Sequence, residues 1–194
     1  MNQPAQTGKH PKGLYVLFFT EMWERFGYYL MVGILFLFMT NSTGKGLPKA
    51  MGADVVGTFI ALVYLTPFIG GLLADRYLGY IKSIFIGGTL MAAGYLTIAL
   101  PGDYTAYIAM GLIIVGNGFF KPNISTLLGN MYNREDLRPL KDNAYNIFYM
   151  GINIGAFFCN FVAAILRNRI GWQAAFSAAG IGLIIGLIAL AINL

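Results

Sequence analysis

Residues 21–29 read Glu-Met-Trp-Glu-Arg-Phe-Gly-Tyr-Tyr, and this stretch decides how the chain must fold. It contains three charged side chains, Glu21, Glu24 and Arg25, although apolar residues flank it on both sides. The apolar run extends from residue 14 to residue 39. A run of about 20 such residues suffices to cross a membrane as a helix. The sequence therefore predicts a membrane helix that carries buried charge.

The composition of the whole chain agrees with a membrane location. Of its 194 residues, 57% are hydrophobic and 11% are charged, whereas a soluble domain has roughly 25% charged residues. The net charge of +5 does not indicate nucleic-acid binding, because the basic residues lie in short segments between apolar runs and not on one face. A single cysteine, Cys159, excludes an intrachain disulfide. We expect an integral membrane protein with no nucleic-acid partner.

Six apolar runs are long enough to span a bilayer as helices. The predicted spans are residues 14–39, 55–74, 83–100, 105–128, 143–166 and 172–192. Only helices and closed barrels satisfy their backbone groups in lipid, and runs of this length are helices. We predict an all-α membrane protein, with a polar tail over residues 1–13 and a six-helix bundle over residues 14–194. Three plus three helices also match a transporter half built from two inverted repeats.

The basic residues predict the orientation of this bundle. With the N-terminus inside, seven of them lie on the cytoplasmic side and four lie outside, which follows the positive-inside rule. The cytoplasmic set is Lys9, Lys12, Arg76, Lys82, Arg134, Arg138 and Lys141, and the outer set is Lys45, Lys49, Arg167 and Arg169. We therefore expect a multi-pass protein with a cytoplasmic N-terminus.

The charges of the opening stretch share one helical face. Glu21, Glu24, Arg25 and Tyr28 are spaced i, i+3, i+4 and i+7, and Val32 follows on the same face. A charged side chain at the bilayer centre costs at least ~2.5–3.5 kcal/mol, so this face must look into the bundle or into a water-filled cavity. Ionisable groups inside membranes usually mark substrate or ion pathways. The alternative is a structural ion-pair network, although buried pairs do not reliably stabilise a protein.

The spacing also predicts how the charges pair. Glu21 and Arg25 suit an i, i+4 ion pair, which leaves Glu24 over. Lys121 is the only other basic residue within a predicted span and is its natural partner. If Lys121 moves or binds a ligand, a glutamate loses a stabilising cation and can take up a proton. Pro122 loosens the helix beside this lysine, which suits a binding site.

Four motifs resemble the proton-dependent oligopeptide transporters, a branch of the major facilitator superfamily. The first is Glu21-x-x-Glu24-Arg25-Phe26-x-Tyr28-Tyr29. The others run from Gly70 to Gly79, from Gly116 to Asn123 and from Phe148 to Gly155. The resemblance covers essentially the whole chain, but only the N-terminal half of a member with at least twelve helices. It implies that a C-terminal six-helix half is a further partner.

The resemblance implies a role for each matching residue. Proton coupling would involve Glu21, Glu24, Arg25 and Lys121. Substrate binding would involve Arg25, Tyr28, Tyr29, Tyr64, Lys121, Tyr149 and Asn153. Asp75 and Arg76 would form a loop that steadies one conformation, and Asp75 could cap a neighbouring helix. Val32 is a departure, because many members carry a second arginine at this position, and it leaves the preferred substrate open.

The function implied is proton-coupled symport of di- and tripeptides across the cell membrane by alternating access. Small peptides, protons and membrane lipid are the expected partners, and neither a cofactor nor a metal is expected. Two alternatives remain: a non-transporting binding or assembly module, and a proton-coupled transporter of another small solute such as nitrate. An enzyme is the weakest reading, because the spans contain neither a nucleophile–base pair nor a metal-ligand cluster.

Overall fold

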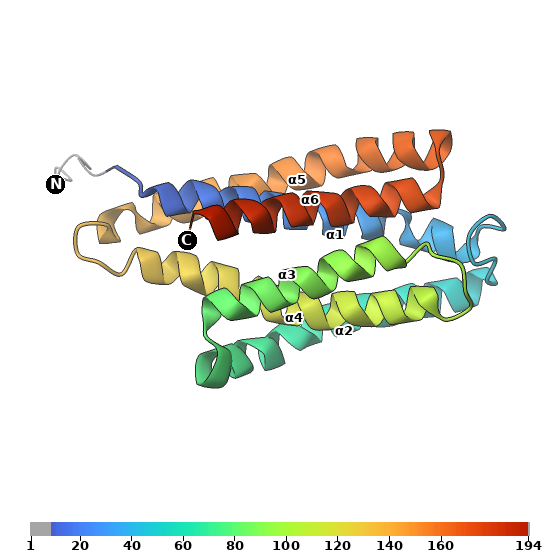
Figure 1. The fold of residues 1–194 in the computed structure, drawn as a ribbon, viewed down its shortest axis with the longest axis horizontal. Helices are drawn as coiled ribbons and strands as arrows, with labels where there is room; N and C mark the ends of the chain where they lie inside the picture. Colours follow the sequence, from blue (N-terminus) through green and yellow to red (C-terminus); the bar gives the residue numbers. More distant parts are fainter. Residues whose placement is uncertain (1–8, 194) are drawn as a thin grey trace.

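The computed structural model describes residues 9–193, and over these residues it contains helices and no strands (Figure 1). The α-helices are α1 (Lys12–Thr40), α2 (Lys49–Leu73), α3 (Tyr80–Thr97), α4 (Thr105–Met131), α5 (Lys141–Arg169) and α6 (Trp172–Ile192). A π-helical turn, η1 (Ala74–Leu78), extends α2, and a 3-10 turn, η2 (Arg138–Leu140), precedes α5. The prediction of an all-α chain is confirmed for this part. Residues 1–8 of the predicted tail and Leu194 lie outside the described residues.

Four of these helices are long and apolar enough to cross a membrane: α1, α2 with η1, α5 with η2, and α6. The other two, α3 and α4, form as helices but are not among these four, and each contains polar side chains. Tyr80 and Lys82 open α3, and α4 contains Asn117, Lys121 and Asn123. Composition alone therefore supports membrane crossing for four of the six predicted spans.

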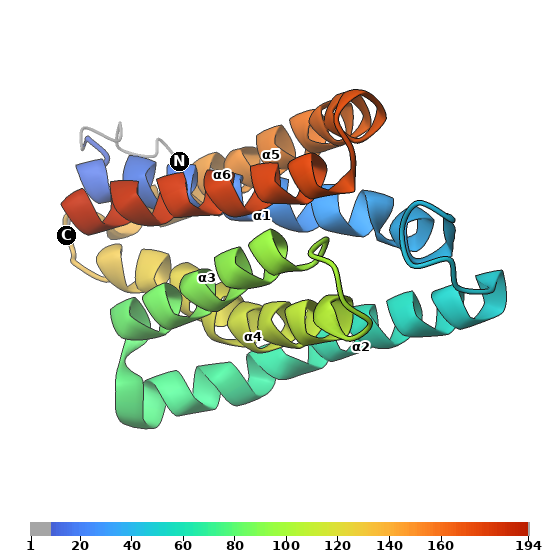
Figure 2. The same cartoon turned by 45° about the vertical axis from the view of Figure 1, so that its right-hand side comes forward.

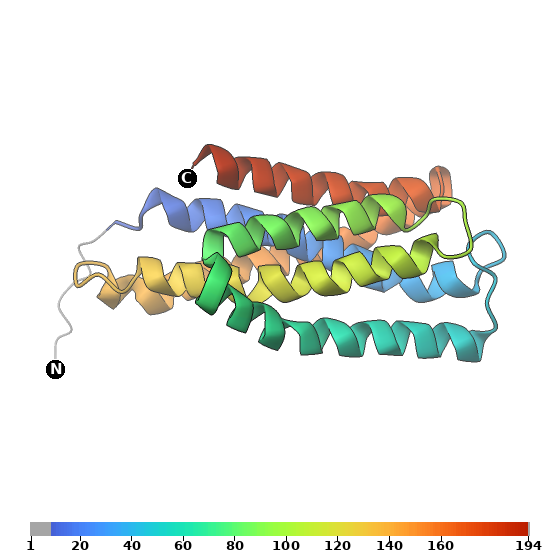
Figure 3. The ribbon, with the colours of Figure 1, turned by 60° about the horizontal axis from the view of Figure 1, so that its bottom comes forward.

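The six helices form two groups of three. In one group α1 packs against α5 and α6, and in the other α4 packs against α2 and α3 (Figure 1 and Figure 2). Contacts between α3 and α6 join the two groups. The start of α1 and the end of α6 lie at the same end of the bundle (Figure 3). Neighbours in space are thus often distant in sequence.

Close backbone approach holds α4 against its neighbours. A Cβ atom on Gly116 would lie 2.6 Å from the carbonyl oxygen of Gly87 in α3, so only glycine fits at this crossing. On the other side, the Thr66 hydroxyl of α2 donates to the Ile114 carbonyl at 2.9 Å. The Asn117 amide donates to the Val63 carbonyl at 3.0 Å. These contacts position the segment of α4 that carries Lys121, one turn beyond Asn117.

Several connections are shorter than expected, among them the two that flank α2. Helix α2 begins at Lys49 and not at residue 55, because Pro48 ends the extended segment and the following residues continue as helix. After α2, the chain stays helical through η1 and then reverses at Gly79, whose φ of 76° favours glycine. The N-cap of α3 is Gly79 itself, with no side-chain hydrogen bond. Asp75 therefore does not cap α3.

Candidate functional site

The charged residues of α1 form one buried cluster around Arg25. Its Nε lies 3.1 Å from Glu21 Oε1 and also donates to Glu24 Oε2. The three residues are almost completely buried, with exposed fractions of 3% for Glu21, 0% for Glu24 and 4% for Arg25. The predicted Glu21–Arg25 ion pair is confirmed, and one guanidinium serves two carboxylates.

Lys121 stands beside this cluster without joining it. The predicted Glu24–Lys121 ion pair is absent from the ion pairs of the described residues, because Arg25 already binds Glu24. The Lys121 ammonium instead lies 5.0 Å from the centroid of the Tyr64 ring, a cation–π contact between α4 and α2. Lys121 still interacts electrostatically with Glu21, Glu24 and Arg25. The four charges balance, with the lysine as the member held most loosely.

Each glutamate keeps one carboxylate oxygen without a hydrogen-bond partner. Glu21 Oε2, Glu24 Oε1 and Arg25 Nη2 are all buried and unpaired among the described atoms. An unpaired buried polar group costs ~1–3 kcal/mol, more when it is charged. The cluster therefore has two carboxylate oxygens and one guanidinium nitrogen that no described protein group satisfies.

Aromatic residues continue the same face of α1. The Arg25 guanidinium lies 5.3 Å from the Tyr28 ring centroid. The Tyr28 and Tyr29 rings meet edge to face with centroids 5.5 Å apart. Tyr28 is buried, Tyr29 is 38% exposed, and Val32 is half-buried against the core. The predicted face is present, and its burial decreases from Glu24 toward Tyr29.

The structure does not bring every predicted site residue to the cluster. Tyr149 and Asn153 lie exposed on α5, where Tyr149 stacks on Tyr145 at 6.3 Å. Neither has a recorded contact with the α1 charges in the described chain. Asp75 and Arg76 are exposed in η1, and no ion pair of the described residues includes them.

The sequence interpretation missed Tyr95 of α3. This residue is 0% exposed, and its hydroxyl has no hydrogen-bond partner among the described residues. It interacts electrostatically with Glu24, Arg25 and Tyr28. Its position within an apolar run was the one sign in the sequence that it could be buried. Residue type alone does not single it out, because the chain has 12 tyrosines.

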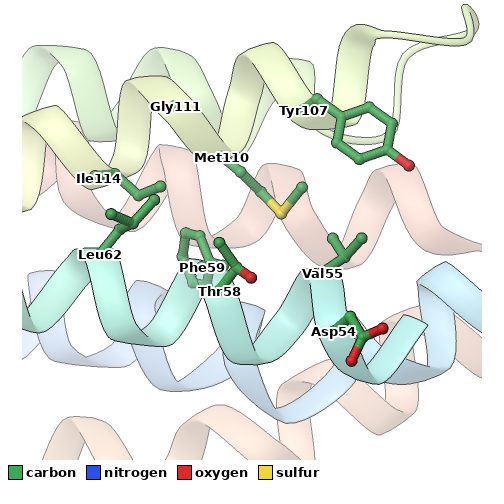
Figure 4. A pocket seen from close by; sticks show the side chains of 9 residues that line it. All are labelled: Asp54, Val55, Thr58, Phe59, Leu62, Tyr107, Met110, Gly111 and Ile114. Carbon is green, nitrogen blue, oxygen red and sulfur yellow. The ribbon is translucent and has the colours of Figure 1, made fainter. Parts of the chain in front are cut away.

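A separate cavity of about 340 Å³ lies between α2 and α4. Asp54 and Tyr107 lie at one end of it, and Leu62 and Ile114 at the other (Figure 4). None of the predicted site residues lines this cavity. Within residues 9–193, no group of three or more potential metal ligands is found. The buried charged side chains of the described residues are therefore those of the α1 cluster.

Known proteins similar to this chain include several named transporters. It is 40% identical to the "Di-/tripeptide transporter" of Lactococcus lactis subsp. lactis (strain IL1403), over 92% of this chain and 37% of the relative. It is 38% identical to "Dipeptide and tripeptide permease A" of Klebsiella pneumoniae (strain 342), over 96% of this chain and 38% of the relative. The chain thus spans well under half the length of these relatives.

Solved structures show the same fold. A crystal structure of peptide transporter POT in complex with sulfate aligns with a TM-score of 0.90 and 39% identity, covering 97% of this chain and 39% of that one. A POT family transporter in complex with 5-aminolevulinic acid aligns with a TM-score of 0.90 and 33% identity, covering 96% and 39%.

The family model described as "POT family" matches residues 81–193, which is more than half of the chain. Members of this family are transporters and not enzymes. Together with its several apolar helices, this match makes the chain part of a multi-pass membrane protein. The chain belongs to the POT family, the proton-dependent oligopeptide transporters that its four motifs resemble.

Proposed function

We propose that the full-length protein imports di- and tripeptides together with protons by alternating access. The observation that carries this proposal is the buried cluster of α1, in which Arg25 serves both Glu21 and Glu24 while Lys121 stays outside the ion pairs. Relatives named di-/tripeptide transporters support the substrate class.

In the proposed coupling step, the carboxylate of a peptide binds the ammonium of Lys121. That ammonium rests on the Tyr64 ring, so it exchanges a cation–π contact for a charge-assisted one. The electrostatic support that Lys121 gives the glutamates is then weakened, and a glutamate takes up a proton. No cofactor or metal takes part. Arg25, Tyr28, Tyr29, Tyr149 and Asn153 would complete this side of the peptide site.

The proposed architecture is a membrane-embedded half-transporter. In this proposal all six helices cross the bilayer, and residues 14–194 form two inverted three-helix repeats. The packing supports it, because exchanging α1 with α4, α2 with α5 and α3 with α6 converts one three-helix group into the other. A C-terminal six-helix half would face this bundle across a central substrate cavity. Asp75 and Arg76 would steady one conformation of the two halves.

The proposed location is the cell membrane with the N-terminus in the cytoplasm. The end of the bundle that holds the start of α1 also carries the larger set of basic residues, including those of η1 and of the α4–α5 connection (Figure 3). The positive-inside rule places that end in the cytoplasm.

Val32 bears on which solute is carried. A second arginine there would hold a carboxylate bidentately, whereas the half-buried Val32 packs against the core. Carboxylate binding then falls to Lys121 and Arg25. A similar transporter is known in complex with 5-aminolevulinic acid, which like a peptide carries an amine and a carboxylate. We therefore favour zwitterionic substrates over simple anions.

The test is uptake by the full-length protein in liposomes acidified outside, with dipeptides, tripeptides and nitrate offered in parallel. We expect peptide uptake that stops when a protonophore removes the gradient. Uptake of nitrate alone would favour an anion transporter. Binding without uptake of any solute would favour a non-transporting module.

A further inference from the structure

Tyr95 is a fully buried side chain whose hydroxyl makes no bond. It lies on α3 and is 0% exposed, and its hydroxyl has no partner among the described residues. A phenylalanine would fill the same space without an unpaired polar atom, which costs ~1–3 kcal/mol when buried. In this conformation no described residue forms a hydrogen bond with the hydroxyl that would stabilise the fold.

The ring of Tyr95 lies directly against α1. A Cβ atom built on Gly27 would be 3.2 Å from Tyr95 Cε2, so the glycine admits the ring at this point. Gly27 is one turn beyond Glu24 and therefore close to it on the surface of α1. The tyrosine thus reaches α1 next to the coupling cluster although it belongs to another helix.

The groups that face Glu24 come from three helices. Glu21, Arg25 and Tyr28 belong to α1, Lys121 belongs to α4, and Tyr95 belongs to α3. Arg25 binds Glu24 Oε2, and Glu24 Oε1 stays buried and unpaired. An unpaired acceptor and an unpaired hydroxyl thus occupy the same buried region.

We propose that Tyr95 is a positioning residue whose hydroxyl donates a hydrogen bond to the unpaired Oε1 of Glu24 once substrate draws Lys121 away from the cluster. This inference rests on the proposed proton-coupled function. An O–H bond to an ionised carboxylate is charge-assisted and strong. It would hold Glu24 ionised and oriented until substrate binding is complete, and so set the pH at which the carrier loads its proton.

The sign of the effect follows from which form the bond favours. A hydrogen bond donated to the ionised carboxylate favours that form, so removing the donor favours the protonated form at a given pH. Tyr95→Phe should shift the pH midpoint of gradient-driven uptake toward alkaline values by about one pH unit. A merely structural hydroxyl would leave the midpoint unchanged, and its removal would lower the melting temperature.

The experiment compares three forms of the full-length protein in liposomes. These are wild type, Tyr95→Phe, and Tyr107→Phe as a control on the half-exposed outer part of α4. We expect an alkaline shift for Tyr95→Phe alone. Replacing Tyr95 with 3-fluorotyrosine, a stronger donor of nearly the same volume, should shift the midpoint the opposite way, and it serves as the test if Tyr95→Phe fails to fold.

Two negative results have different meanings. If wild type takes up peptides and the profile of the Tyr95→Phe protein, or of the fluorotyrosine protein, coincides with it, the role of Tyr95 is overturned while the proposed function stands. If wild type itself shows no gradient-driven peptide uptake, the proposed function fails first.

Discussion

At the residue scale, Arg25 and Lys121 have different physical roles although both are cations near the same glutamates. Arg25 is buried and bonded to two carboxylates, whereas Lys121 is half-buried and rests on an aromatic ring. The first maintains the cluster, and the second is free to respond to a ligand.

This difference predicts stability effects of unequal size for two substitutions. Arg25→Met leaves two carboxylates buried without their cation, and breaking such a pair costs ~3–5 kcal/mol. Lys121→Met breaks no ion pair and should change the free energy of unfolding by less than about 1 kcal/mol. Thermal unfolding of the full-length variants in detergent measures both. Equal melting temperatures for the two would contradict the assignment.

The sequence predicted the Glu21–Arg25 pair but not the partner of Glu24. Helical spacing identifies neighbours at i, i+3 and i+4, and it treats consecutive residues as pointing apart. The arginine side chain is long enough to bring its Nε to both carboxylates, one of them on the adjacent residue. Tyr95 was missed for a related reason, because only the packing of α3 on α1 reveals it.

At the element scale, α4 packs closely on α3, with backbone atoms of α3 lying directly against it. A Cβ atom on Gly116 would lie within 2.8 Å of backbone atoms of Gly87 and Met91. Gly111 of the same helix has nothing within 4 Å. The two glycines thus form a matched pair, one enclosed and one open.

Gly116→Ala should destabilise the protein by ~1–3 kcal/mol through overpacking. Gly111→Ala should be neutral or stabilising by up to ~1 kcal/mol, because alanine is the better helix former. Melting temperatures of the two variants provide the comparison. A Gly116→Ala protein as stable as Gly111→Ala would show that α3 and α4 do not approach as described.

Helix ends were predicted well only where the residue types change sharply. Gly171 and Asn193 flank α6, and its observed bounds, Trp172–Ile192, match the apolar run. At α2 the apolar run starts later than the helix, since Lys49–Asp54 is helical but polar enough to resemble a loop. An apolar run predicts which residues enter the membrane, whereas a helix continues as far as its backbone hydrogen bonds do. The two can therefore start at different residues, as they do in α2.

At the scale of the whole molecule, the number of helices was predictable and their packing was not. Six apolar runs indicated six helices, and the charges on one face of residues 21–28 required that face to be covered. The pairing of α1 with α5 and α6 leaves no signature in the sequence, because the two three-helix segments show no strong self-similarity. Long-range packing had to come from the structure.

The proposed orientation predicts which surface positions react from outside a cell. In a Cys159→Ser background, Thr43→Cys in the α1–α2 connection should react with a membrane-impermeant thiol reagent in intact cells. Arg76→Cys in η1 should react only after the membrane is opened. Both positions are exposed, so burial does not explain a difference. The reverse pattern would place the N-terminus outside.

The most direct test of the account is proton-driven dipeptide uptake by full-length Glu24→Gln, with Glu135→Gln in the exposed α4–α5 connection as the control. Glutamine resembles the protonated carboxyl but cannot release a proton. We predict that Glu24→Gln loses uptake driven by an acidic exterior yet still exchanges peptide across the membrane without a gradient, while Glu135→Gln behaves as wild type. Undiminished gradient-driven uptake by Glu24→Gln would contradict a role for the α1 cluster in proton coupling.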